Sequence, residues 1–190
     1  MNTKSRIRIV SLALFITVFV VWIVFYIIIS DYIGKTTQKQ MTLAAGQIIE
    51  RLGGEFTQVE RLSYSLKQNA DVTALMRETD PVKFFSLAGK IDGLAELKAY
   101  NLDFIDSIVI YGADRNYYRL TGRLGNNACM RLAGTVFKLD MPKHLSVVLE
   151  NKRYIGYTDE IELGYEGQTG AVVILIEEEK VLEIIRAYAH

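Results

Sequence analysis

The chain has 190 residues with 22 basic and 22 acidic side chains, two histidines and one cysteine. One cysteine excludes an internal disulfide framework and a cysteine-based zinc site, and two histidines make a histidine-rich site unfavourable, so we predict neither a metal nor a cofactor. Removing the three basic residues that precede Ile9 leaves 19 basic against 22 acidic side chains, a balance that argues against direct binding of nucleic acid.

The most apolar segment, residues 9–30, contains 22 consecutive residues without a formal charge, from Ile9 to Ser30. At about 1.5 Å per residue a helix of this length reaches about 33 Å, which exceeds the roughly 30 Å of a hydrocarbon core. The segment therefore predicts a transmembrane helix. A cleaved signal peptide is the alternative, but the apolar core of such peptides is only about 7 to 15 residues long.

The charges that flank this segment predict its orientation. Lys4, Arg6 and Arg8 precede it without an acidic residue among them, and the first charge after it is Asp31. Basic residues favour the cytoplasmic side of a membrane. We therefore expect residues 1–8 to form a cytoplasmic tail of a single-pass protein of the cell membrane, with the main domain on the extracytoplasmic side.

Residues 31–70 are predicted to form a stalk helix. Apolar residues recur there every three or four positions, which is helical periodicity close to a heptad. The stripe has two possible partners. It packs on the chain's own domain, or it pairs with a second copy of the chain and makes the protein a homodimer joined through the stalk. Gly53 and its neighbour Gly54 lower helix propensity, and we expect a bend near Gly53. The stripe consists of Met41, Ala45, Ile48, Leu52, Phe56, Val59, Leu62 and Leu66.

Two short helices are expected next. Asp71 is a candidate N-cap for the segment DVTALMRE, residues 71–78. Asp80 followed by Pro81 predicts the start of a second helix, which would continue to Asn101.

The remaining segments predict an α+β domain over residues 71–190 with an antiparallel sheet of about five strands. Residues 104–123 favour a hairpin, and residues 153–163 and 170–177 favour another. The glycine- and asparagine-rich residues 122–129 indicate a loop, and residues 133–139 are compatible with either a third strand or an irregular crossover. Residues 142–149 have helical spacing, and residues 178–190 predict an amphipathic helix.

The order of these elements resembles the extracytoplasmic Cache-type sensor domains, which have PAS-like folds. The resemblance covers the chain after Met1 and is carried by the anchor, the long helix and the segments QNADVTALM, NLDFIDSIVIYGADRNYY and GAVVILIEEEKVLEIIRAYAH. The most similar variety is the sensor region of double-Cache histidine kinases and membrane-anchored helix-turn-helix regulators of Gram-positive bacteria. The resemblance implies binding of a small extracellular metabolite between the sheet and its covering loops, with signalling by small shifts of a dimer.

The chain departs from this family in two respects. The amino-acid-binding branch has a Tyr-x-Arg-x-Trp-Tyr pattern, which Tyr117, Tyr118 and Arg119 match only in part, because Trp22 lies in the apolar segment. Amino-acid specificity is therefore not supported. A second domain half, a second span and an output module would follow in such receptors, so we expect a receptor truncated before any output domain, or a stand-alone remnant.

Two sets of side chains are candidates for ligand binding. Arg119 can hold a carboxylate through a bidentate pair, with Tyr118 closing over the ligand. Asp159 can accept an ammonium group, and Tyr157 shares its face of the strand because strand residues alternate. Packing residues and solvated charges are the alternative for both sets. The complete candidate list is Tyr111, Tyr118, Arg119, Arg131, Tyr157 and Asp159.

We predict no enzymatic activity, because neither histidine stands in a recognisable constellation with a serine or with Cys129. The preferred function is an extracytoplasmic ligand-sensing module of a bacterial membrane receptor. The alternative is a membrane-anchored structural or interaction protein of the cell envelope.

Overall fold

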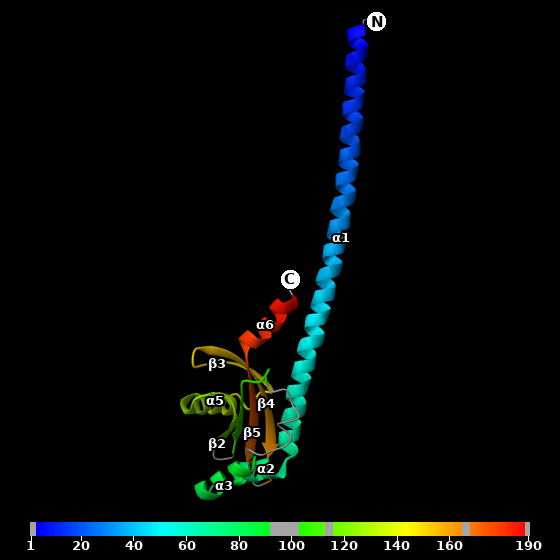
Figure 1. Ribbon diagram of the computed structural model, residues 1–190. Helices are drawn as coiled ribbons and strands as arrows, with labels where there is room; N and C mark the ends of the chain where they lie inside the picture. The colour runs from blue at the N-terminus through cyan, green and yellow to red at the C-terminus, as the bar shows by residue number, and fades with distance from the viewer. Residues whose placement is uncertain (1–2, 92–102, 113–115, 165–167, 189–190) are drawn as a thin grey trace. The chain divides into compact units, whose positions relative to one another are not determined.

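A computed structural model describes residues 3–91, 103–112, 116–164 and 168–188, with side chains of the first helix described from Phe15 onwards. The chain divides into two compact units, Met1–Gln47 and Ile48–His190. The predicted stalk of residues 31–70 therefore contributes to both units. The boundary between the units lies within a single helix, α1, which spans Thr3–Gln68 (Figure 1).

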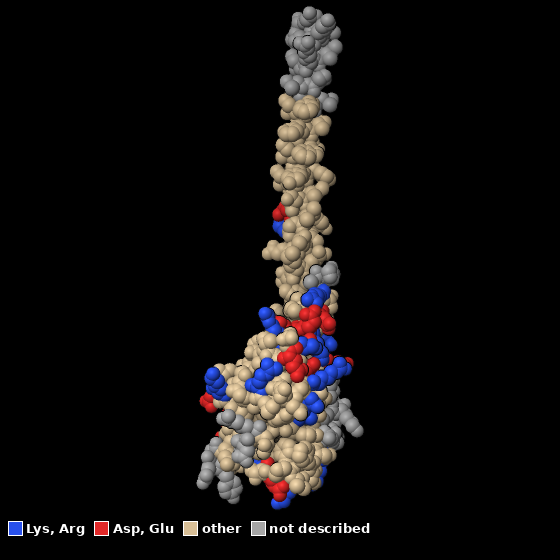
Figure 2. Space-filling view, turned by 90° about the vertical axis from the view of Figure 1, so that its left-hand side faces the viewer, with Lys and Arg blue, Asp and Glu red and all other residues tan. Residues whose placement is uncertain are grey.

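The first unit is the N-terminal part of α1. Its apolar side chains from Phe15 to Ile33 are exposed, and the visible surface of this stretch is almost free of charge (Figure 2). By length and composition α1 is a candidate membrane span. The helix continues without interruption through Gly53, so the predicted bend does not break it.

The second unit is α+β and is built on a five-stranded antiparallel sheet, as predicted. The strand order is β2-β1-β5-β4-β3. The strands are β1 Ser107–Tyr111, β2 Tyr117–Thr121, β3 His144–Leu149, β4 Lys152–Glu162 and β5 Thr169–Glu177. Both predicted hairpins are confirmed, since β1 pairs with β2 and β4 pairs with β5, all antiparallel.

One face of the sheet is covered by the C-terminal part of α1, and α2 and α3 lie at one end of the sheet and pack into the same core (Figure 1). Val59, Leu62 and Leu66 of α1 are buried on this face, so over residues 59–66 the predicted stripe packs on the chain's own domain. Alternation along β1 places Ile108 and Ile110 on the same face. These contacts fix the C-terminal part of α1 against the sheet.

The opposite face is covered by α5, Asn126–Lys138 (Figure 1). The predicted loop is confirmed over residues 122–125 and wrong from Asn126, where α5 begins; the strand or crossover predicted at 133–139 is wrong, because α5 continues to Lys138. Ala128, Leu132 and Val136 recur every four residues and are buried against the sheet. This helical period outweighs the turn preference of Asn126 and Asn127.

The predicted helix at residues 142–149 is also wrong, because β3 lies there. Leu145 and Leu149 are buried on one face of that strand. A two-residue turn, Glu150–Asn151, joins β3 to β4 with φ values of 50° and 63°. Positive φ at both positions is the requirement of a type I′ hairpin turn, whose twist matches that of the strands.

The start of one short helix was predicted incorrectly, and the start of the other was predicted correctly. α2, Ala70–Arg77, is capped by Asn69, whose side chain accepts from the backbone N–H groups of Asp71 and Val72, so the predicted Asp71 cap is wrong. α3, Pro81–Ile91, begins as predicted: the Asp80 side chain accepts from the Val82 N–H at 2.8 Å. Its predicted continuation over residues 92–101 lies outside the described residues.

The last helix, α6, spans Glu178–Tyr188 and follows β5 directly, as predicted. It leaves the sheet at the end opposite to α2 and α3 (Figure 1). Val181 and Ile184 pack against the core on the α1 side of the sheet. The acidic residues Glu178 and Glu179 occupy its first turn, where negative charge favours the helix dipole.

Candidate functional site

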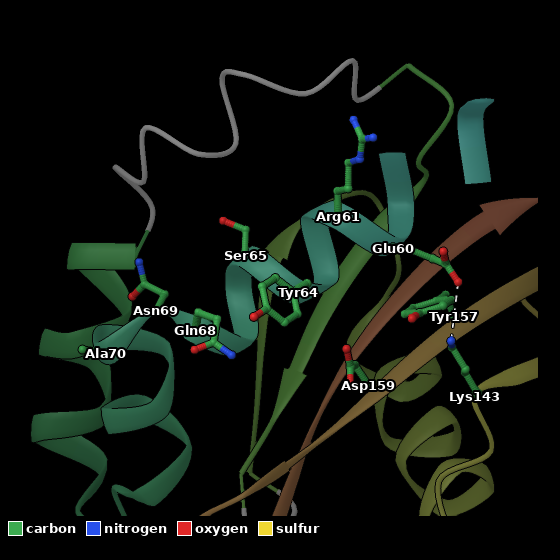
Figure 3. Close-up of a pocket in the computed structure, with 10 residues that line it drawn as sticks. All are labelled: Glu60, Arg61, Tyr64, Ser65, Gln68, Asn69, Ala70, Lys143, Tyr157 and Asp159. Carbon is green, nitrogen blue, oxygen red and sulfur yellow. Dashed lines mark ion pairs between the residues drawn. The ribbon is translucent and has the colours of Figure 1, made fainter. Parts of the chain in front are cut away.

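A groove of 890 Å³ lies where the end of α1 meets β4 and the start of β3. We call it the α1–β4 groove (Figure 3). It brings together residues from four parts of the second unit. Its lining residues are Glu60, Arg61, Tyr64, Ser65, Gln68, Asn69, Ala70, Lys143, Tyr157 and Asp159.

Local periodicity explains how each element contributes. The buried stripe of α1 turns Glu60 and Tyr64 to the exposed side of the helix. Tyr157 and Asp159 are two residues apart on β4, so both lie on the face of the sheet that carries α1. Lys143 precedes β3 and reaches the groove from the neighbouring strand.

Two ion pairs join α1 to the sheet across the groove. Lys143 Nζ lies 3.5 Å from Glu60 Oε1, and Lys67 Nζ lies 3.1 Å from Asp159 Oδ1. The Ser63 hydroxyl also donates to Asp159 Oδ2 at 3.4 Å. Asp159 thus receives both of its partners from α1. A ligand that competes for this carboxylate necessarily changes how the sheet holds the helix.

Tyr157 is the buried aromatic residue of the groove, and Tyr64 is the exposed one. Tyr157 is only 7% exposed, its ring lies 5.5 Å from that of His144, and Lys143 Nζ stands 5.6 Å from its ring centroid. The pKa of Lys143 is raised by Tyr157 and, second, by Glu60. The groove therefore combines an aromatic surface with carboxylate and ammonium groups, a set suited to small polar molecules that carry charge.

The structure brings together two of the six predicted site residues, Tyr157 and Asp159. Tyr118 packs against Phe84 with ring centroids 6.5 Å apart. Arg119 donates to the Leu124 carbonyl oxygen. Neither residue lines the α1–β4 groove.

The other two predicted residues lie on the α5 side. Tyr111 is fully buried, and its hydroxyl donates to the Cys129 carbonyl oxygen at 2.8 Å. Burial, with Cys129 second, raises the pKa of this phenol. Arg131 is exposed on α5. Tyr111 is thus placed as a core residue and Arg131 as a surface residue, and neither lines the groove.

Sequence reasoning missed Glu60, Tyr64 and Lys143. The first two carried a usable signal, because they flank the buried stripe at helical spacing. Lys143 gave no such signal. The helix predicted at residues 142–149 concealed the fact that this residue lies beside β4.

The described residues contain no group of three or more histidine, cysteine, aspartate or glutamate side chains placed to hold a metal ion. Comparison of the chain with protein-family models, with curated proteins and with solved structures gave no match.

Proposed function

We propose that the protein is an extracytoplasmic ligand-sensing module of a bacterial membrane receptor. In this proposal residues 9–30 cross the membrane, residues 1–8 lie in the cytoplasm, and the second unit is a Cache-type, PAS-like domain. A small extracellular metabolite binds in the α1–β4 groove. Two copies pair through the part of the stalk whose apolar side chains are exposed, including Met41 and Ile49.

The observation that carries this proposal is the position of the groove on α1. The ion pairs of Glu60 and Lys67 connect the sheet to the same helix that contains the apolar segment. A ligand shifts a conformational equilibrium only through its differential affinity for two states. A charged metabolite that displaces Lys67 from Asp159 has such a difference in affinity. It binds more tightly to the state in which α1 no longer holds the Asp159 carboxylate.

The anchor and its orientation have separate support. The apolar stretch is long enough to cross a bilayer. The three basic residues before it favour a cytoplasmic N-terminus. The side chains of the apolar stretch are exposed in the isolated chain, as expected for side chains that contact lipid.

Thermal unfolding of the full-length protein in detergent micelles tests the sensing function. The panel contains amino acids, carboxylates, amines and sugars. We expect at least one compound to raise the Tm by several degrees, because a ligand at 100 times its Kd stabilises the folded state by about 2.7 kcal/mol.

The same measurement on variants locates the site. We expect Asp159→Asn to abolish the ligand-induced rise, measured against its own ligand-free Tm. Glu160→Gln is the matched control, because it removes the same charge from the neighbouring exposed position of β4. A folded protein that responds to no compound contradicts the proposed function, and a rise that survives in Asp159→Asn contradicts the groove as its site.

A second candidate function is that of an anchored interaction protein of the cell envelope. It is favoured by Val82 and Phe85 on α3, which are large, apolar and exposed. Purification with one stoichiometric envelope protein, lost in Phe85→Ser, together with no response to the compound panel, would favour this function over sensing.

A further inference from the structure

A second cavity, of 740 Å³, lies at the end of the sheet where β5 is followed by α6. We call it the α6 cleft. It is formed by the chain before β1, the end of β2, the turn between β3 and β4, and the junction of β5 with α6. It shares no lining residue with the α1–β4 groove. Its acidic lining residues are Asp103, Asp106, Glu150 and Glu177.

Tyr154 is the most deeply buried polar residue of this cleft. It is 3% exposed, yet it lines the cavity. Its hydroxyl makes no hydrogen bond with any residue in the described part of the chain. Burial raises its pKa, and the neighbouring Asp106 raises it further, so the phenol is neutral and close to carboxylates. The hydroxyl oxygen is not among the fully enclosed polar atoms without a partner in the described residues, so it faces the open space of the cleft and is available to a ligand.

Two of the carboxylates make their hydrogen bonds to neutral groups among the described residues, and Asp106 also lies close enough to Lys152 to raise the pKa of this lysine. Asp106 Oδ2 accepts from the Ser107 hydroxyl at 2.7 Å, and Glu150 Oε1 accepts from the Gly125 N–H at 3.0 Å. Each carboxylate has further lone pairs, since a carboxylate accepts about four hydrogen bonds.

The nearby lysines are already engaged. Lys152 Nζ pairs with Glu177 at 2.8 Å. Lys180 Nζ donates to the carbonyl oxygens of Asp103 and Ile105, at 2.6 and 3.1 Å. Arg123 lies on an exposed part of the lining. With four acidic and three basic lining residues, the cleft has one negative charge in excess, and two of the three basic groups are already engaged.

We propose that the α6 cleft binds a small organic cation with a primary ammonium group. The three N–H donors of such a group match the carboxylates of Asp106 and Glu150 and the hydroxyl oxygen of Tyr154. This site is independent of the proposed sensing function, because it depends on different residues.

The cleft also contains the contacts that hold the start of α6. Glu177 is the last residue of β5, and Lys180 lies in the first turn of the helix. A cation in the cleft competes with Lys152 and Lys180 for carboxylates and carbonyl groups. Binding of a cation in the cleft is therefore expected to change how strongly the backbone amides in the first turn of α6 are protected against hydrogen exchange.

Isothermal titration of the full-length protein in micelles tests the site, with propylamine as the cationic probe and 1-propanol as its neutral counterpart. We expect saturable binding of propylamine at pH 7 and none of 1-propanol. Binding should weaken at least tenfold in Asp106→Asn and about fivefold in Tyr154→Phe. Glu160→Gln, which removes an exposed carboxylate outside the cleft, should bind propylamine like the wild type.

Circular dichroism establishes that each variant is folded, and Glu150→Gln replaces Asp106→Asn if the latter does not fold. Hydrogen exchange with and without propylamine should differ at residues 178–181. The proposal is overturned if propylamine does not bind, if 1-propanol binds equally, or if Tyr154→Phe and the folded carboxylate variant bind propylamine with unchanged affinity.

Discussion

The two parts of α1 place the same kind of residue in different surroundings. Between Phe15 and Ile29 large apolar side chains lie on all sides of the helix and are exposed, and the aromatic pairs Phe15–Phe19 and Trp22–Tyr26 stack along it. Between Ile48 and Gln68 the apolar residues narrow to a stripe, and Val59, Leu62 and Leu66 are buried against the sheet.

The difference shows that periodicity, rather than hydrophobicity alone, decides what a helix contacts. A helix that is apolar all round requires a uniformly apolar environment, such as a bilayer or a large core. A helix with one apolar stripe needs only one apolar surface to pack against. In this chain both cases occur in a single helix, so one element contains the candidate anchor and part of the domain core.

The largest effect that tests this comparison is expected from Leu62→Ala. Leu62 is fully buried in the second part of α1. Its truncation removes buried apolar surface and leaves a cavity, which should lower the free energy of unfolding by about 3 kcal/mol. Denaturant unfolding followed by circular dichroism measures this loss. Gln58→Ala, at an exposed position of the same helix, should change it by less than about 0.5 kcal/mol. Equal losses in the two variants would show that the stripe is not core.

A somewhat smaller effect is expected from Val24→Arg in the first part of α1. Val24 lies inside the proposed span but away from its centre, so an arginine there should cost somewhat less than a charged residue at the centre, which costs about 2.5 kcal/mol on insertion scales. We expect a smaller fraction of the protein to remain in membranes after alkaline extraction, whereas Val24→Leu should behave like the wild type. Unchanged retention of Val24→Arg would argue against a span centred on this stretch.

The smallest effect compares the two acid–lysine pairs of the helix. Asp31 and Lys35 are exposed and four residues apart, whereas Lys67 pairs with Asp159 of β4 and is partly covered. We expect Lys67→Ala to lower the stability of the second unit by about 0.5 kcal/mol, since partial exposure screens the pair. Lys35→Ala should leave that stability unchanged. The effect of Lys67→Ala should disappear in 1 M salt, where the Debye length is about 3 Å. A larger effect of Lys35→Ala would contradict the contrast between a local and a tertiary pair.

The elements with strong periodic signals were predicted correctly from the sequence. The alternating pattern around Ile108 and Val109 indicated a strand, and the proline after Asp80 indicated the start of α3. The segments with competing signals were not predicted correctly. In α5, Asn126 and Asn127 indicated a loop although the buried residues downstream repeat every four positions. In β3, a six-residue segment was too short to separate helical from alternating spacing.

The site was predictable only where local periodicity determines it. The alternation of β4 is enough to place Tyr157 and Asp159 on one face of the strand. The pairing of Lys67 with Asp159, and of Glu60 with Lys143, depends on which helix crosses which strand. No local pattern in the sequence specifies that crossing. The same limit applies to the α6 cleft, which several separate segments form.

The single cysteine of the chain can report on the opening of α5 from the sheet. Cys129 lies on the buried face of α5 with no exposed surface, and burial raises its pKa, so little of the reactive thiolate is present at neutral pH. An alkylating reagent can therefore modify it only when α5 opens from the sheet. The rate of alkylation measures how often that opening occurs, and cysteines introduced at the surface can be labelled selectively without first removing the natural one.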